Sequence, residues 1–153
     1  MIEPVSRATV EAFYRAYISR DPYQIGATLD DDVEWHITGP AEAIKICGFW
    51  RGKAAVVERF RLVSEVIALK RLDIEHLLVD GDSSAMFGRI TSLLHETGRV
   101  ISHRVAQIVR YRAGKVIHFS VINDSFDAAE QFLGHRLNVH DTSAPADGEL
   151  VVV

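Results

Sequence analysis

The most constraining feature of this sequence is a change of hydrophobic period near residue 70. Before it, apolar residues recur at helical spacing, and after it the chain alternates residue by residue up to Asn123. Short turns interrupt the alternation at 80–82, 96–99 and 113–114. Turns this short join antiparallel neighbours, because a parallel crossover needs about a dozen residues or more. The pattern therefore predicts a meander of strands at 72–79, 83–95, 100–112 and 115–123.

The region before the meander carries signals for three helices. They are predicted at 5–19, 22–29 and 52–70. Ser6 and Asp21 are residue types that cap helix N-termini, because their side-chain oxygens accept backbone N–H groups of the first turn. Pro22 suits a first helical position, where its missing amide hydrogen needs no partner.

Two further elements complete the expected order. Residues 33–37 alternate aromatic and branched side chains, which predicts a strand between the second and third helices. After the meander, Asp124 or Ser125 is expected to cap a short last helix, and Gly134 to close it.

Helices first, then a meander, then a closing helix are typical of an α+β domain. We expect a cone-shaped, curved antiparallel sheet of about four to six strands wrapped around the N-terminal helices. The helices cannot fill its whole concave face, so a cavity lined by apolar and a few polar groups is expected there. Residues 1–134 are predicted to form this domain. Residues 135–153 are interpreted as a tail that is mobile or packs on a partner subunit.

The predicted strand at 100–112 places a glutamine on an otherwise mostly apolar face. Side chains alternate across a strand, and three arginines on one of its sides indicate that this side is exposed to solvent. Gln107 lies on the other side, which also carries His103, Val105, Val109 and Tyr111. A buried amide without a partner costs about 1–3 kcal/mol. Gln107 is therefore expected to contact a neighbouring side chain, a trapped water or a ligand.

The same alternation extends to the neighbouring strands and predicts the walls of the pocket. Together with aromatic residues of the first helix, the expected ligand-lining residues are Phe13, Tyr14, Tyr17, Trp35, Ile37, Val105, Phe119, Val121 and Asn123.

Composition narrows the classes of partner. The net charge is −4 and the densest basic stretch, 110–112, is short, so we expect no nucleic-acid partner. Cys47 is the only cysteine, so no intrachain disulfide is possible, which favours a cytoplasmic location. Its side chain is interpreted as a core or pocket-mouth thiol. No leader and no apolar run of about 18 residues is seen, so no membrane partner is expected. His135 and His140, with Asp141, are too sparse for a metal site, and no cofactor is expected.

Four segments in this order have a familiar arrangement: AFYRAYISRDPYQIGATLDDDVEWHITGP, FWRGKAAVVERF, VDGDSSAMFGRITSLLHETGR and RYRAGKVIHFSVINDSFDAAEQFLG. The ordered set, from about residue 5 to 134, resembles the SnoaL-like and ketosteroid-isomerase-like branch of the nuclear transport factor 2-like superfamily. The resemblance implies a cone-shaped α+β barrel, usually a homodimer through the outer face of its sheet.

The resemblance also places the family's catalytic positions on this chain. In ketosteroid isomerases an aspartate moves a proton next to a carbonyl, while a tyrosine and a protonated aspartate hold the enolate oxygen. The base position falls at or beside Ile37, next to His36, and the tyrosine position falls at Phe13. The second aspartate position falls at Gln107, where SnoaL-like cyclases often carry histidine. The catalytic aspartate of those cyclases falls at Val121.

Gln107, His36 and His103 are therefore the candidate catalytic residues. Gln107 cannot titrate, but its amide can donate a hydrogen bond to a carbonyl or enolate oxygen. A histidine suits the role of base because its pKa lies near neutrality. Tyr14 or Tyr17 is expected to offer a phenol to the same pocket.

Three functions remain open at this point. An isomerase, cyclase or hydrolase would move a proton on a hydrophobic carbonyl-bearing or polycyclic molecule, and it needs a titratable group in the cavity. A non-catalytic protein that binds hydrophobic small molecules would have a cavity without His, Asp or Glu. A dimerising scaffold would fill the cavity with its own side chains. The inward face of Gln107 favours a small-molecule pocket over a scaffold.

Overall fold

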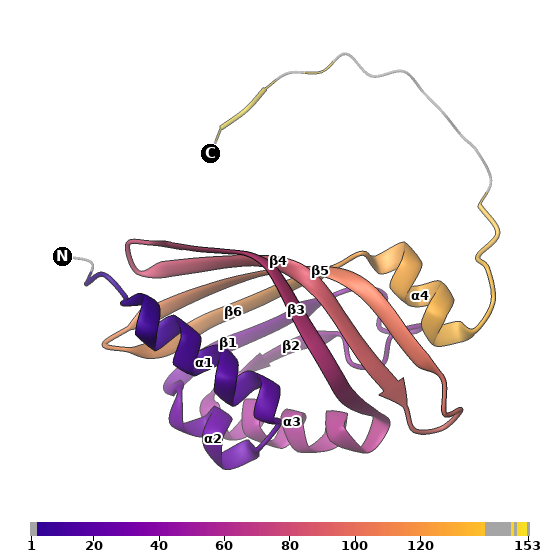
Figure 1. Ribbon diagram of the computed structural model, residues 1–153, viewed down its shortest axis with the longest axis horizontal. Coiled ribbons are helices and arrows are strands. Elements are labelled where there is room, and N and C mark those ends of the chain that lie inside the picture. Colours follow the sequence, from indigo (N-terminus) through magenta and orange to yellow (C-terminus); the bar gives the residue numbers. More distant parts are fainter. Residues whose placement is uncertain (1–2, 140–147, 149, 153) are drawn as a thin grey trace.

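The computed structural model of the chain describes residues 3–139, 148 and 150–152. Its helices are α1 (Arg7–Ser19), α2 (Pro22–Ala27), α3 (Lys53–Val66) and α4 (Ser125–Leu133). Its strands are β1 (Leu29–Thr38), β2 (Gly48–Arg51), β3 (Ile67–Asp80), β4 (Ser83–Leu94), β5 (Val100–Arg112) and β6 (Lys115–Asn123). Figure 1 shows α1, α2 and α3 together on one side of the sheet, with α4 apart from them. Most of the tail predicted at 135–153, including His140 and Asp141, lies outside the described residues.

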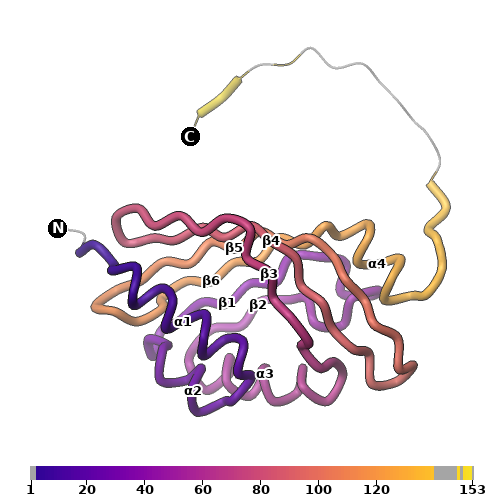
Figure 2. The backbone as a smooth tube through the Cα atoms, viewed as in Figure 1, coloured from indigo at the N-terminus to yellow at the C-terminus, as the bar shows by residue number. Residues whose placement is uncertain are grey.

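The strands form one six-stranded sheet in the order β2-β1-β6-β5-β4-β3. Strands β3 to β6 pair antiparallel with one another, which confirms the predicted meander. Figure 2 shows the backbone of this sheet curving over the helices, and the sheet stays open because β2 and β3 are its edges. The α+β fold with a curved sheet around N-terminal helices is therefore confirmed.

One pairing differs from the wholly antiparallel sheet that was expected. Strands β1 and β6 run parallel, with Trp35 opposite Phe119. A parallel pair needs a long crossover, and α3 with most of the meander lies between these two strands in the chain. Strand β2 was not predicted, because its four residues are too few to show a period.

The helix boundaries follow the expected capping residues. Ser6 and Asp21 each accept a backbone N–H of the first turn, at 3.1 and 2.8 Å, and Pro22 is the first residue of α2. Gly134 ends α4 with a φ of 80°, a conformation that suits glycine. Asp124 occupies the N-cap of α4, but its side chain makes no capping hydrogen bond, which corrects the role assigned to it.

The third helix is shorter than the predicted range of 52–70. Helix α3 ends at Val66, and Ile67 already pairs with Leu94 as the first residue of β3. The side chains of Ile67 and Leu94 are buried in one cluster with Ile101. Burial and ladder hydrogen bonds therefore outweigh the local helical spacing. The added length carries β3 along the full edge of the sheet.

The curvature of the sheet has a local cause between β3 and β4. The pairing shifts register between Ile74 and His76, and such bulges bend and twist a strand. Gly88 stands opposite Ile74, and a Cβ placed on it would lie 2.0 Å from the backbone oxygen of Asp73. The close approach of the two backbones at the bend therefore requires glycine.

Aromatic side chains fill part of the space between the sheet and the helices. The rings of Trp35 and Phe119 stack with centroids 3.7 Å apart and planes inclined by 14°. Phe13, Tyr17 and Phe60 pack around this pair from α1 and α3. Each ring buries about 150–250 Å², so the cluster is the main apolar contribution on this side of the sheet. The cavity described below begins where this cluster ends.

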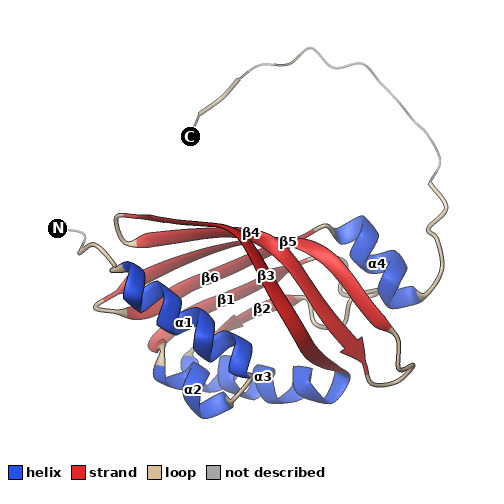
Figure 3. Cartoon of the chain, viewed as in Figure 1, coloured by secondary structure: helices blue, strands red, loops and turns tan. Residues whose placement is uncertain are grey.

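Helix α4 lies apart from the other three helices, as Figure 3 shows. Side-chain hydrogen bonds attach it to β5. The Gln131 amide accepts from the backbone N–H of Ser102 and donates to its carbonyl, both at 2.7 Å. Arg99 donates to the carbonyl oxygens of Gln131 and Phe132 at 2.9 and 3.0 Å. These bonds hold Phe132 in the wall of the cavity.

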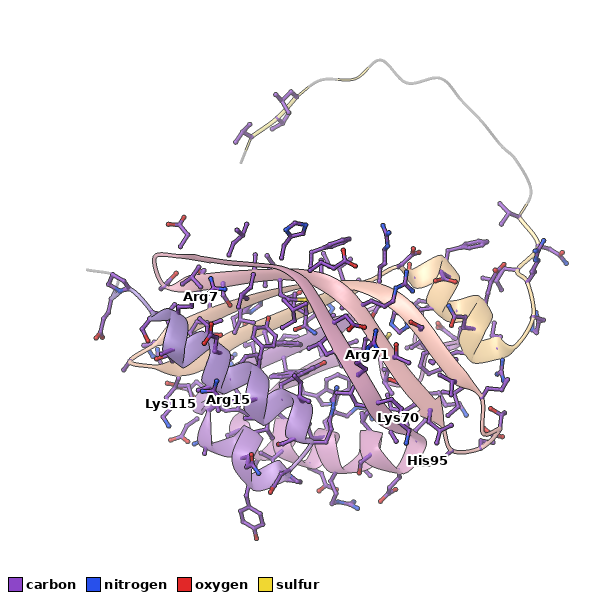
Figure 4. All side chains as sticks on the ribbon, in the orientation of Figure 1. Arg7, Arg15, Lys70, Arg71, His95 and Lys115 are labelled. Atoms are coloured by element: carbon purple, nitrogen blue, oxygen red, sulfur yellow. The ribbon has the colours of Figure 1, made fainter. Side chains whose placement is uncertain are left out.

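Basic side chains are spread over separate elements. Figure 4 labels Arg7 and Arg15 on α1, Lys70 and Arg71 on β3, and Lys115 on β6. Arg7 and Arg71 form ion pairs with acidic neighbours on their own elements. The five labelled basic side chains therefore come from three separate elements.

Candidate functional site

A cavity lies between the concave face of the sheet and the helices α1, α3 and α4. With its open mouth included, it has about 640 Å³ of empty space. Its walls are mostly apolar, as in typical small-molecule sites. The polar side chains that line it are Tyr17, Arg20, Arg59, Ser92, His103, Gln107 and Asn123.

Most of the residues predicted for the pocket line this cavity. They are Tyr17, Trp35, Ile37, His103, Val105, Gln107, Val121 and Asn123. Strands β1, β5 and β6 supply all of them except Tyr17, which comes from α1. The alternation of side chains along these strands was therefore the signal that located the site.

His36 does not reach the cavity, and the prediction that it does is wrong. It is exposed on the outer face of β1, where its ring lies 6.0 Å from that of Phe49. Trp35 and Ile37 point inward, so the residue between them must point outward.

Three aromatic residues expected in the wall belong to the packed core instead. Phe13 and Phe119 are buried in the ring cluster around Trp35 and do not line the cavity. Tyr14 is buried too, and its hydroxyl has no hydrogen-bond partner in the described part of the chain. Burial, with Tyr111 and Tyr17 nearby, raises the pKa of Tyr14 far above its usual range. The phenol offered to the cavity is therefore that of Tyr17.

Gln107 points inward, as predicted, and is only 1% exposed. Its Nε2 donates to the Tyr17 hydroxyl oxygen at 3.4 Å, which is long for a hydrogen bond. Its Oε1 has no partner among the described residues. The amide is thus only half satisfied by the protein, and a buried polar atom without a partner costs about 1–3 kcal/mol.

His103 is oriented by Asn123. The Asn123 amide nitrogen donates to the backbone oxygen of Thr38 at 3.0 Å, which leaves its Oδ1 to face His103. That oxygen lies 3.1 Å from His103 Nε2 and can only accept, so Nε2 carries the hydrogen. In the neutral ring the other nitrogen, Nδ1, is then an unprotonated acceptor. Nδ1 is buried without a partner in the described chain.

Burial favours the neutral form of His103. It lowers the pKa of His103 below its usual value and outweighs the hydrogen bond that His103 donates to Asn123 and the charges of Asp127 and Asp124, which act in the opposite direction. A neutral imidazole with a free Nδ1 can take up a proton at neutral pH. His103 is therefore the titratable group that a catalytic pocket would need.

Two cavity residues, Arg20 and Arg59, were missed by the sequence analysis. Arg20 follows Tyr17 by three residues at the end of α1, and its guanidinium carbon lies 4.3 Å from the centre of the Tyr17 ring. Arg59 stacks on Trp50 at 4.5 Å and donates to the backbone oxygen of Lys45 at 2.6 Å. The spacing from Tyr17 was a signal for Arg20. Nothing in the sequence pattern distinguishes Arg59 from its exposed neighbours.

Cys47, another group that the sequence analysis singled out, does not line the cavity. Cys47 is buried in a cluster with Ile44 and two alanines of α4, and burial raises its pKa to about 11. It is a protonated core thiol, as one of the two interpretations held. Within the described residues, no three His, Cys, Asp or Glu side chains are grouped to hold a metal ion. None of the described helices has the length and apolarity to cross a membrane.

Comparison with known proteins decides the family. Residues 10–119 match the model of the SnoaL-like domain. The chain belongs to the SnoaL-like family. No curated protein matches it.

Solved structures extend the likeness to almost the whole domain. A provisionally named isomerase from Rhodopseudomonas palustris is 28% identical, with a TM-score of 0.78 over 86% of this chain and 100% of that one. A nuclear transport factor 2-like protein from Burkholderia thailandensis is 26% identical, with a TM-score of 0.70 over 81% and 94%. The protein TerC, crystallised with polyporic acid, shares the fold at 22% identity, with a TM-score of 0.72 over 82% and 96%. The likeness therefore covers 81–86% of this chain and 94–100% of the length of these proteins.

Proposed function

We propose that this SnoaL-like protein binds a hydrophobic carbonyl compound and moves a proton on it, with His103 as the base. The observation that carries the proposal is the free, unprotonated Nδ1 of His103 in the wall of an apolar cavity. Asn123 holds the ring in this tautomer. The pocket-protein fold of the family and the isomerase name of one structural relative support the same class of reaction.

The reaction would proceed by two proton transfers. His103 Nδ1 takes a proton from a carbon of the ligand, and the electron pair moves through conjugated bonds to the carbonyl oxygen, which becomes an enolate. The Tyr17 hydroxyl or the Gln107 amide donates a hydrogen bond to that oxygen. The histidine then returns the proton to another carbon, so the ligand is isomerised without gain or loss of atoms.

The spacing of these groups defines the shape of the ligand. His103 and Gln107 are four residues apart on the same face of β5, which puts their Cα atoms about 13 Å from each other. Both side chains line the cavity. A ligand that reaches both must be extended, which favours a polycyclic or conjugated carbonyl compound over a small simple ketone.

Hydrogen–deuterium exchange tests the chemistry directly. The protein is incubated in D₂O with 2-tetralone and with a polycyclic β,γ-unsaturated ketone, and deuterium uptake and double-bond migration are followed by NMR. The His103→Gln variant should lose at least about a hundredfold in rate, the usual contribution of a positioned base. The matched control is His36→Gln, which removes an exposed histidine of the outer face. Equal rates in the wild type and His103→Gln would overturn the role of the base.

A second candidate function is non-catalytic binding. It is favoured by the absence of the family's acids, since Val121 and Gln107 occupy two of their positions and no carboxylate lines the cavity in the described chain. If the wild type binds either ketone but exchanges protons no faster than buffer, the binding function stands and the enzymatic one does not.

We also propose that the chain forms a homodimer through the outer face of its sheet. Phe87, Ala106 and Ile122 are cross-strand neighbours there, and Ile108 and Leu78 lie in the next row. Their exposed fractions, 37% for Phe87, 57% for Ile122, 49% for Ile108 and 66% for Leu78, are high for large apolar residues. Contiguous apolar surface of this kind usually marks an interface.

Sedimentation velocity tests the interface. The Ile108→Glu variant places a charge in the centre of the apolar rows, and it should sediment as a monomer at concentrations where the wild type is a dimer. Val100→Glu, which changes an exposed residue at the end of β5, is the control. A wild type that is monomeric at all concentrations would refute the dimer.

A further inference from the structure

The charges around the cavity are unbalanced. Arg20 and Arg59 line it, whereas no aspartate or glutamate of the described chain does. Both guanidinium groups stay charged at neutral pH, because arginine does not lose its proton in that range. The cavity wall thus carries two positive charges with no negative one beside them.

Neither arginine is held by an acidic side chain in the described structure. Other arginines form ion pairs, such as Arg61 with Glu58 and Glu65. Arg20 instead lies over the faces of two aromatic rings, at 4.3 and 5.3 Å from their centres, and Arg59 lies over one ring at 4.5 Å. Stacking occupies the flat face of a guanidinium and leaves the N–H groups in its plane available to a ligand. One of them is already used, because Arg59 donates to the backbone oxygen of Lys45.

Both arginines are also partly buried. The Nε atoms of both arginines are buried without a partner in the described chain. Burial also lowers the pKa of Arg59 below its usual value, in keeping with its half-buried position. The position of Arg20 at the C-terminus of α1 accounts for its positive charge there, because a helix C-terminus attracts positive charge. It does not account for a second arginine, from α3, in the same wall.

We propose that the ligand of this cavity carries a carboxylate, which Arg20 and Arg59 bind while the apolar body of the ligand lies toward Gln107 and His103. This inference rests on the proposed function as a small-molecule pocket and names the class of ligand. Both arginines are half-buried, whereas Gln107 and His103 are buried, so the carboxylate would lie nearer the mouth. Guanidinium groups suit a carboxylate because their parallel N–H groups match its two oxygens.

Two probes of equal shape test the charge separately from the pocket. The probes are 2-naphthoate and 2-naphthamide, which are flat and differ in charge but hardly in size. Binding to the intact chain is measured by titration calorimetry at low and high salt. The wild type should bind 2-naphthoate about tenfold or more tightly than 2-naphthamide, the effect expected of a charge-assisted hydrogen bond. High salt should reduce the difference, because exposed charges are screened.

Variants assign the effect to the two arginines. Arg20→Gln and Arg59→Gln should each weaken 2-naphthoate about tenfold and leave 2-naphthamide within about twofold. The control is Arg15→Gln, which removes an exposed positive charge of α1 outside the cavity wall (Figure 4). If the variants weakened 2-naphthoate binding only by lowering the positive charge of the protein, Arg15→Gln would weaken it as well. If Arg20 and Arg59 contact the carboxylate, Arg15→Gln should leave binding unchanged.

The outcomes separate the two proposals. If both probes bind equally well and the arginine variants change neither, the carboxylate inference is overturned while the pocket stands. If neither probe binds at millimolar concentration, the pocket itself is refuted along with the inference. If Arg20→Gln or Arg59→Gln unfolds the chain, the comparison of the two probes on the wild type, with its salt dependence, still decides the question.

Discussion

Replacing Gln107 with leucine should make the protein more stable and its ligand binding weaker. Leucine has nearly the volume of glutamine, and it removes the buried Oε1 that has no partner in the described chain, worth about 1–3 kcal/mol. It also removes the hydrogen bond to Tyr17, which at 3.4 Å is weak and contributes about 0.5 kcal/mol. The net expectation is an unfolding free energy about 1 kcal/mol higher.

Equilibrium unfolding in urea measures this difference. The midpoint should rise with an unchanged slope, and the melting temperature should rise by about 2–4 °C. Binding of 2-tetralone should weaken about tenfold, because its carbonyl oxygen loses the hydrogen-bond donor that Gln107 offers. The control is Met86→Leu, the buried cross-strand neighbour of Gln107, which does not line the cavity. It should cost less than about 1.5 kcal/mol and leave binding unchanged.

The opposite result would refute the reasoning. A loss of more than about 1 kcal/mol in Gln107→Leu would show that the amide oxygen is satisfied within the folded protein, for example by an ordered water. Gln107 would then be a structural residue, and unchanged ligand binding in the same variant would remove it from the site. A gain in stability together with lost binding is the pattern expected of a residue retained for function.

Three further predictions concern other parts of the chain. Burial lowers the pKa of His103 in the folded protein, so the unfolded chain binds the proton first as the pH falls. The free energy of unfolding should therefore decrease below about pH 6.5. In urea unfolding, His103→Gln should flatten this part of the pH dependence. Gln131→Ala loses both hydrogen bonds to the Ser102 backbone and should cost about 1–3 kcal/mol, with faster hydrogen exchange at the Ser102 amide; unchanged exchange would contradict the attachment of α4. Gly88→Ala drives a Cβ against the backbone oxygen of Asp73 and should cost about 3 kcal/mol or more in urea unfolding; a loss below 1 kcal/mol would show that the bend relaxes.

The sequence alone determined the meander and the face that each strand turns inward. Period-two alternation is local, so the arginines of β5 were enough to place Gln107 and His103 on the concave side, where the structure has them. The capping residues and the turns are local signals too, and they located α1, α2 and the boundaries of β5 and β6. The ordered set of these elements was enough for the family.

Only the tertiary structure decided how distant segments meet. The parallel pairing of β1 with β6 and the end of α3 at Val66 depend on contacts between residues far apart in the chain. The same is true of the chemistry of the site. Asn123 selects the tautomer of His103 from a neighbouring strand, and Arg59 reaches the cavity from α3.

The physical reason is that periodicity reports which side of its own element a residue occupies, and not which partner it finds there. Folding brings the amide of Gln107, the imidazole of His103 and the guanidinium groups of Arg20 and Arg59 around one cavity and excludes water from it. Only then can these groups act together on a ligand.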